Sequence, residues 1–409
     1  ISLTLNHIFS ISNNISFLNY SWSFWLIFSW FFLFLFHVFN VYVTNRFMSK
    51  SWVRKQKSNL IKLQKLKIEN LKKEAEIESK IKAESEIFNK KSQLITIIVA
   101  AAENDVIGID NLSGGYKAFV TKGDNFKFVK LNLERRKKVE ELFKEHNPDV
   151  LYHFAAYAAE GLSPFIRNFN YRNNLLCSAN LINPCIKYKT KMIFTSSMAV
   201  YGGQETPFTE DKQPQPIDPY GMAKYAVECD LKMAATQFGL RYNIVRPHNV
   251  LGTYQNIWDR YRNVIGIFIR KTLNGQPILV YGDGEQTRAF SDIRYYMRPF
   301  DLLLDEFDGE TFNIGADKFF TLNQVAETVQ SIGKKYGYDV PIEHGPPRHE
   351  VKHAYCDHTK AKTLLKFEDD TKLEELIETM FVWAMKQPNR KVKDIEYEIT
   401  EGIYDYWKN

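Results

Sequence analysis

Cysteine is scarce in this chain, and the few that occur are not spaced for a metal or redox role. The 409 residues include four cysteines. They are Cys177, Cys185, Cys229 and Cys356, and no two form a CxxC pair. A disulfide framework and a cysteine-ligated metal are therefore not indicated, and the pattern favours a reducing compartment with no structural metal.

Motifs that read nucleic-acid bases are also absent, although the formal net charge is +6. Much of the basic excess lies in residues 46–91, so the charge does not indicate nucleic-acid binding. Hydrophobic residues make up 44% and charged residues 25%, as in an ordinary globular protein. A length of 409 residues allows one large two-lobed domain or two domains.

The hydrophobic segment 1–47 contains one long apolar run, Trp22–Val43, that has no Asp, Glu, Lys or Arg. The run is about long enough to cross a bilayer. No Lys or Arg precedes it and several follow, so the positive-inside rule places the C-terminal side in the cytoplasm. We expect either a membrane anchor with the catalytic part facing the cytoplasm or a cytoplasmic protein. The Phe-, Asn-, Ser- and Ile-rich composition also fits translated AT-rich non-coding DNA.

Residues 48–91 have a different composition and are predicted to form a charged helical linker. Ser58–Phe88 is rich in Lys and Glu, with Leu and Ile scattered through it. This pattern indicates a solvated helix and only weakly a coiled coil.

Tyr220 and Lys224 lie four residues apart, directly after Pro219. A helix that begins near the proline places both side chains on one face. An ammonium beside a phenol favours the phenolate, so the lysine is predicted to lower the tyrosine pKa from about 10 towards the working pH. Upstream, a predicted strand ends in Ser196 and Ser197, whose hydroxyls can share a substrate hydroxyl with the tyrosine. The set suits the proton abstraction that accompanies hydride transfer, although such a Tyr–Lys spacing also occurs by chance on many helices.

The order of strand, Ser-Ser, loop and Pro-Tyr-x-x-x-Lys resembles the extended short-chain dehydrogenase/reductase family, from about Asp105 to the C-terminus. Within that family it is most similar to the NAD-dependent sugar-nucleotide epimerases of the UDP-glucose 4-epimerase type. The resemblance implies an α/β fold over residues 92–409, with a Rossmann-like doubly wound parallel sheet. It also implies a smaller C-terminal α/β substrate lobe, mainly residues 250–290 and 310–370.

The activity implied by the resemblance is C4 epimerisation of a UDP-sugar through a transient 4-keto sugar and enzyme-bound NAD. Ser197, Tyr220 and Lys224 would be the catalytic residues, with Tyr220 removing the proton of the C4 hydroxyl. Members that dehydrate or decarboxylate sugars usually carry an acid close after the serine. Here Met198 and Ala199 follow it, which favours epimerisation. The family also commonly forms homodimers.

The cofactor site is implied by the ends of two predicted strands. Asp105–Ser113 would be the second strand of the sheet, with Asp110 accepting from the adenosine ribose hydroxyls and favouring NAD over NADP. The full implied cofactor set is Asp110, Asn111, Phe154, Ala155, Ala156, Asn174, Tyr220 and Lys224. Asn132 stands where the family usually has an aspartate that meets the adenine.

The glycine-rich phosphate loop is the feature most conspicuously missing. It should lie roughly thirty residues before Asp110, yet neither G-x-x-G-x-x-G nor G-x-G-x-x-G occurs there. We interpret Ser92–Ala102 as the remains of the first helix, with the first strand and its loop absent. That loss would expose strand edges and remove the helix N-terminus that binds pyrophosphate. Either foreign sequence has replaced the true start, or the protein is degenerate and has little affinity for NAD.

The substrate residues implied by the resemblance are Ser197, Asn249, Arg288 and Arg348, and the two arginines would grip the diphosphate bidentately. His248 is expected to be a packed or substrate-contacting histidine. Residues 371–407 are expected to form a structural amphipathic helix. The sugar stays open, and so do two alternatives: an NAD-free scaffold of the same fold, and another NAD-dependent nucleotide-sugar epimerase or dehydratase.

Overall fold

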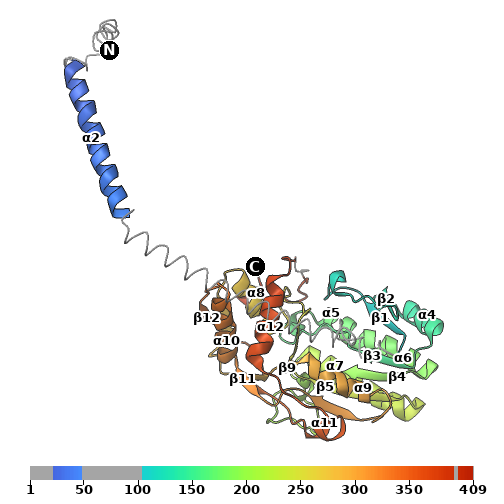
Figure 1. The fold of residues 1–409 in the computed structure, drawn as a ribbon. Coiled ribbons are helices and arrows are strands. Elements are labelled where there is room, and N and C mark those ends of the chain that lie inside the picture. Colours follow the sequence, from blue (N-terminus) through green and yellow to red (C-terminus); the bar gives the residue numbers. More distant parts are fainter. Residues whose placement is uncertain (1–21, 48–103, 391–394, 409) are drawn as a thin grey trace. The chain divides into compact units, whose positions relative to one another are not determined.

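The computed structural model describes residues 22–47, 104–390 and 395–408 (Figure 1). The chain divides into two units, Ile1–Glu76 and Ile77–Asn409. The predicted linker 48–91 and the interpreted first helix, Ser92–Ala102, lie outside the described residues. Both therefore stay predictions.

The first unit contributes one described helix, α2 (Trp22–Phe47), which forms over the apolar run (Figure 1). Among the helices of the described residues, none has the combined length and apolar character needed to cross a membrane. The membrane anchor predicted at Trp22–Val43 thus gains no support from the structure.

The strands that precede the C-terminal lobe belong, together with β10, to a four-stranded and a two-stranded parallel sheet (Figure 1). The larger has the strand order β10-β5-β4-β3 and the smaller pairs β1 with β2. Their strands are β1 (Val106–Asp110), β2 (Phe126–Lys130), β3 (Val150–His153), β4 (Lys191–Thr195), β5 (Tyr242–Pro247) and β10 (Thr311–Ile314). In the larger sheet Met192 of β4 pairs with Leu151 of β3 on one side and Tyr242 of β5 on the other. The predicted parallel α/β architecture is confirmed.

Helices make the crossovers that parallel strands require. The crossover helices are α4 (Arg136–His146), α5 (Arg167–Tyr171), α6 (Cys177–Tyr188) and α7 (Pro219–Phe238), with a π-helical stretch, Arg172–Leu176, joining α5 to α6. Val139, Leu181 and Val227, one from each of α4, α6 and α7, are buried against Met192 and Phe194 of β4. This core fixes α7, which follows β4, against the sheet.

The strand edges of β1 and β3 are not paired with each other among the described residues. Three of the four β3 residues are only half-buried, whereas four of the five β4 residues are buried. A doubly wound sheet has its first strand between these two edges. The first strand that the sequence analysis interprets as missing would lie between these two edges, and this stays a prediction because residues 48–103 lie outside the described part of the chain.

The C-terminal lobe combines short strands with three longer helices. The helices are α8 (Val264–Leu273), α10 (Leu322–Lys335) and α12 (Leu373–Met385), with the short α9 (Met297–Leu302) and α11 (Thr359–Leu364) nearer the large sheet. The strands pair as β7 (Ile278–Tyr281) with β12 (Ile342–Gly345), β6 (Val250–Leu251) with β9 (Ser291–Asp292), and β8 (Thr287–Ala289) with both β11 (Phe319–Thr321) and β13 (His353–Ala354). One apolar core joins the three longer helices to β7.

The helix expected over residues 371–407 is only partly correct. It ends with α12 at Met385, and Pro388 follows within three residues. Proline has no amide hydrogen and its ring clashes with the preceding turn, so the helix cannot continue. Beyond it, residues 395–408 contain a single 3-10 turn, Asp405–Trp407.

Candidate active site

Tyr220 and Lys224 lie on the buried face of α7, as their spacing predicts. The helix begins at Pro219, and the Asp218 carboxylate caps it by accepting from the Gly221 amide at 2.9 Å. Proline suits this first position because its missing N–H has no partner there in any case. Tyr220 is 7% and Lys224 2% exposed.

The two serines after β4 point to different partners. Ser196 donates to the carboxylate of Glu228 at 2.5 Å. Ser197 is hydrogen-bonded with Tyr220, and its Oγ also accepts from the Ala199 amide at 3.1 Å. The structure therefore brings the predicted Ser197 and Tyr220 together at the carboxyl end of the sheet, where doubly wound folds place their chemistry.

The side chain of Lys224 is buried beside Tyr220. Its Nζ donates to the carbonyl oxygen of Thr195 at 2.8 Å and lies 6.0 Å from the centroid of the Tyr220 ring. Burial lowers the pKa of Lys224 to about 7, and the charge of Glu228 opposes that shift. Burial likewise raises the pKa of Tyr220, while the hydrogen bond with Ser197 opposes it. The prediction of a lowered Tyr220 pKa is thus wrong, because burial dominates and raises it.

Replacing Lys224 with methionine should stabilise the fold at pH 7. The folded pKa of about 7 lies below the ordinary 10.5, so the stability linked to this lysine is complete above 10.5 and is lost as the pH falls to about 7. At pH 7, Lys224→Met should raise the free energy of unfolding by on the order of 3 kcal/mol, since one pKa unit corresponds to about 1.4 kcal/mol and the Thr195 hydrogen bond is lost.

Urea unfolding at pH 7 and pH 10 measures this difference. The gain should shrink at pH 10. There the lysine of the folded chain is already neutral, and a larger fraction of the unfolded chain carries a neutral lysine than at pH 7. Lys232→Met, at an exposed position of the same helix, serves as the control and should show no such dependence on pH. A destabilised Lys224→Met protein at pH 7 would contradict the desolvation argument.

The predicted ribose acid lies at the end of β1. Asp110 is exposed, and its carboxylate accepts from the Leu112 amide in the turn that follows. Asn111 accepts in the same way from the Ser113 amide at 2.8 Å. These two hydrogen bonds shape the turn that directly follows β1.

Beyond β3, the chain passes through the small residues Ala155 and Ala156, and Phe154 packs edge-on against Phe300. The buried Asn174 holds this loop, because its Oδ1 accepts from the Tyr157 amide at 2.8 Å and its Nδ2 donates to the Tyr157 carbonyl at 3.1 Å. Asn174 therefore fixes the backbone of this loop, and its predicted contact with the cofactor stays a prediction.

The described residues fit part of a dinucleotide. An exposed carboxylate at the end of β1 suits ribose hydroxyls, and small side chains after β3 allow close approach. The Lys224 ammonium suits the ribose at the nicotinamide end. Pyrophosphate is normally bound by the N-terminus of the first helix, and no described residue belongs to such a helix. The residues present thus fit the two ribose ends of NAD, but they do not supply its pyrophosphate site.

The predicted substrate residues are held in different ways. Asn249 donates to the carbonyl of Ala289 at 2.9 Å. Arg288 bonds the Glu350 carboxylate at 2.9 Å and the carbonyls of Val351 and Lys352 at 2.7 and 3.1 Å. Arg348 instead lies over the ring of Tyr281. Arg288 is therefore held by a carboxylate and by carbonyl oxygens, whereas Arg348 is held by tyrosine rings and by hydrogen bonds with Tyr281 and Tyr406.

His248 is fully buried, with its ring 4.8 Å from that of His358. Burial lowers the pKa of His248 well below its usual range, and neither ring nitrogen has a hydrogen-bond partner among the described residues. Of the two expected roles, packed or substrate-contacting, the burial of His248 fits the packed one.

Two features of the site were not predicted from the sequence. Glu228 forms a fully buried ion pair with Arg246, and its place four residues after Lys224 was a usable signal. The aromatic residues near the C-terminus surround Arg348, for which the sequence held no comparable signal.

Residues 93–315 match a protein-family model described as the NAD dependent epimerase/dehydratase family. This match begins beside Ser92, where the sequence analysis places the remains of the first helix. Residues 1–62 match a second model, described as a 2TM domain.

Similar proteins include the putative UDP-glucose 4-epimerase of Methanocaldococcus jannaschii, which is 31% identical over 290 residues, or 70% of this chain and 92% of the relative. The UDP-glucose 4-epimerase of Thermotoga maritima, solved with UDP-glucose, has 32% identity and a TM-score of 0.64 and covers 68% of this chain and 90% of its own. The UDP-N-acetylglucosamine 4-epimerase of Methanobrevibacter ruminantium, solved with UDP-N-acetylmuramic acid, has 29% identity and a TM-score of 0.64 and covers 70% and 92%.

Proposed function

We propose, from the premise that this chain belongs to the NAD dependent epimerase/dehydratase family, that it interconverts UDP-sugars that differ in configuration at C4. The observation that carries the proposal is the arrangement of Ser197, Tyr220 and Lys224 at the carboxyl end of β4. Met198 and Ala199 directly follow Ser197 and can neither give nor take a proton, which favours epimerisation over elimination of water.

In this proposal the Tyr220 oxygen accepts the proton of the C4 hydroxyl, and Ser197 shares the same hydrogen bond. Bound NAD+ would supply an acceptor for the C4 hydride and the hydride that returns to the 4-keto sugar, together with a positive charge. Burial raises the Tyr220 pKa, and a nearby positive charge would lower it and favour the phenolate. Lys224, held by the Thr195 carbonyl, stabilises the phenolate and holds the nicotinamide ribose.

The named relatives support UDP as the common part of the substrate. One was solved with UDP-glucose and another with UDP-N-acetylmuramic acid, so the nucleotide is shared while the sugar differs. Within this chain, Asn249, Arg288 and Arg348 are the residues proposed to contact the nucleotide-sugar.

The test uses the full chain with added NAD and four UDP-sugars: UDP-glucose, UDP-galactose, UDP-N-acetylglucosamine and UDP-glucuronate. Proton NMR should show interconversion of at least one pair of C4 epimers. Substrate deuterated at C4 should keep its label, because the same hydride returns to the same carbon. A folded chain that binds no NAD in calorimetry and turns over none of the four would favour the NAD-free scaffold.

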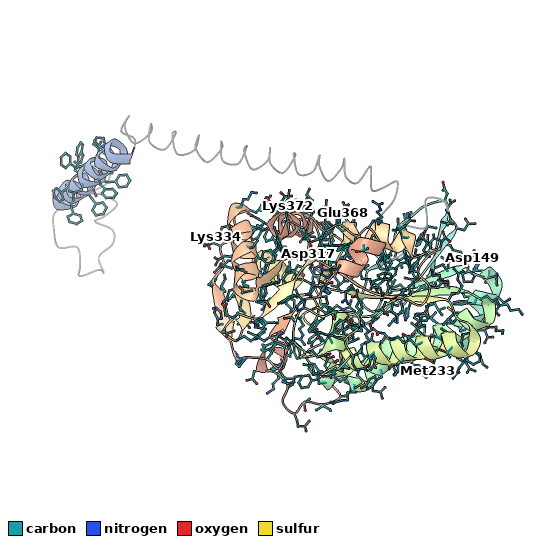
Figure 2. All side chains as sticks on the ribbon, turned by 90° about the horizontal axis from the view of Figure 1, so that it is seen from below. Asp149, Met233, Asp317, Lys334, Glu368 and Lys372 are labelled. Atoms are coloured by element: carbon teal, nitrogen blue, oxygen red, sulfur yellow. The ribbon has the colours of Figure 1, made fainter. Side chains whose placement is uncertain are left out.

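Two further parts of the prediction concern assembly. A homodimer would cover the outer face of α7, where Met222, Met233 and Phe238 are 47%, 53% and 63% exposed; Figure 2 labels Met233 on that helix. Exposed apolar side chains gathered on one helix are typical of an interface.

The membrane anchor at Trp22–Val43 stays a prediction, for which the 2TM-domain match is the available support.

A further inference from the structure

The loop that follows β1 is attached to the C-terminal lobe, at a distance in sequence from its own strand. This β1 loop, residues 111–120, begins directly after the predicted ribose acid Asp110. Asn256 of the C-terminal lobe donates to the Gly114 carbonyl at 2.8 Å, across 142 positions of the sequence. A Cβ at Gly114 would collide with the guanidinium of Arg262, so the glycine lets this arginine pack directly on the loop backbone. The lobe therefore contacts a part of the cofactor-binding half.

Arg390, which follows α12, lies over aromatic rings from both sides of this contact. Its guanidinium carbon is 4.7 Å and 4.9 Å from the ring centroids of Tyr116 and Phe119, in the β1 loop. It is 5.3 Å from the ring centroid of Trp258, in the C-terminal lobe. A cation within about 6 Å of a ring face is attracted by the ring quadrupole. One guanidinium thus joins the β1 loop to the lobe.

The rings beside Arg390 also pack on one another and on the core of the lobe. Tyr116 meets Trp258 edge-on with ring centroids 5.2 Å apart, and Phe119 stacks on Trp258 at 6.2 Å. The Phe119 ring also lies 5.7 Å from that of Trp383, on α12. Trp258 belongs to the apolar core that joins α8, α10 and α12 to β7, and the two rings of the loop pack against that core. The β1 loop is therefore fixed to the core of the C-terminal lobe.

Hydrogen bonds within the β1 loop set its shape but not its place. The Phe119 amide donates to the Tyr116 carbonyl at 2.9 Å, within a single 3-10 turn. Among the described residues β1 itself pairs only with β2. The Asp110 carboxylate accepts from the Leu112 amide, which belongs to the loop. A displaced loop would therefore also displace this carboxylate.

We propose that Arg390 is a positioning residue for NAD, which holds the β1 loop in the place where Asp110 meets the adenosine ribose. The proposal rests on the proposed function for the identity of the cofactor, and on the predicted role of Asp110. Arg390 itself does not contact the cofactor. It holds the rings of Tyr116 and Phe119 against the C-terminal lobe, and the loop holds the carboxylate. The lobe thereby helps to retain NAD while nucleotide-sugars bind and leave.

Calorimetric titration of the full chain with NAD, and separately with UDP, tests this role. Arg390→Met removes the cation and should weaken NAD binding about tenfold, while UDP binding stays within about twofold. Hydrogen exchange at the Phe119 and Val120 amides, which donate within the loop, should become about tenfold faster, and exchange along α7 should not change. In an Asp110→Ala background, Arg390→Met should weaken NAD binding by less than about twofold, because the arginine acts through Asp110.

Variants of the rings separate a positioning role from general packing. Tyr116→Leu removes a ring and should reproduce the effect of Arg390→Met, whereas Tyr116→Phe keeps the ring and should bind NAD as the unmodified chain does. Tyr338→Leu is the matched control, because Tyr338 is a half-buried tyrosine that packs against the same core and contacts the ring of Phe381. It should leave both affinities unchanged.

Three results for Arg390→Met would overturn the proposal: equal losses of NAD and UDP affinity, unchanged exchange in the β1 loop, or an undiminished effect in the Asp110→Ala background. An unmodified chain that binds no NAD would also overturn it. NAD binding that depends on Arg390, without turnover of any UDP-sugar, would instead overturn the proposed function alone.

Discussion

Tyr220→Phe is expected to reduce turnover of the UDP-sugar on the order of a thousandfold, since a positioned acid–base group typically contributes that much. Tyr220 is 7% exposed, and phenylalanine preserves its ring and therefore its packing on α7. What the variant loses is the hydroxyl, which is hydrogen-bonded with Ser197. Turnover should be measured at saturating substrate beside thermal unfolding, and Tm should change by no more than a few degrees.

A second tyrosine on the same helix gives the control. The Tyr225 hydroxyl accepts from the Gln213 amide at 2.7 Å, away from Ser197. Tyr225→Phe removes a hydroxyl from α7 without touching the site, so it should keep turnover near that of the unmodified chain. If Tyr220→Phe stays within tenfold of the unmodified chain while Tyr225→Phe behaves as expected, Tyr220 is not the base.

The local structure around this tyrosine could be predicted because short-range rules decide it. Proline at the first position, the Asp218 cap and the four-residue spacing place Tyr220 and Lys224 on one face of α7. The direction of the Tyr220 pKa could not be predicted in the same way. It depends on burial, which is set by contacts with β4 and other distant elements, and desolvation outweighs the neighbouring charge.

Long-range pairings explain the other differences. The sequence identifies Arg288 as a phosphate ligand by its motif, but Glu350, 62 residues away, occupies its guanidinium in the structure. The aromatic rings of the C-terminal segment reach Arg348 from more than fifty residues away, after a helix that was expected to continue.

Glu228→Gln should lower the free energy of unfolding by about 3–5 kcal/mol, because removing one partner leaves a buried charge uncompensated. Glu228 and Arg246 are 0% and 1% exposed, and their side chains form two parallel hydrogen bonds of 3.0 and 2.6 Å. A glutamine of the same size places an N–H₂ donor against a guanidinium that can only donate. Urea unfolding at pH 7 measures the loss.

An exposed ion pair serves as the control that separates the effect of losing a charge from the effect of burying its partner. Lys138 and Glu141 on α4 form a salt bridge with both side chains 61% exposed, so Lys138→Met should change stability by well under 1 kcal/mol. The double variant Glu228→Leu with Arg246→Met removes both buried charges and should recover much of the stability lost in Glu228→Gln. If the double variant is no more stable than Glu228→Gln, packing rather than the unpaired Arg246 charge explains the loss. Because the pair joins β5 to the helix that carries Tyr220, recovery of folding without recovery of turnover would show that the pair also positions α7.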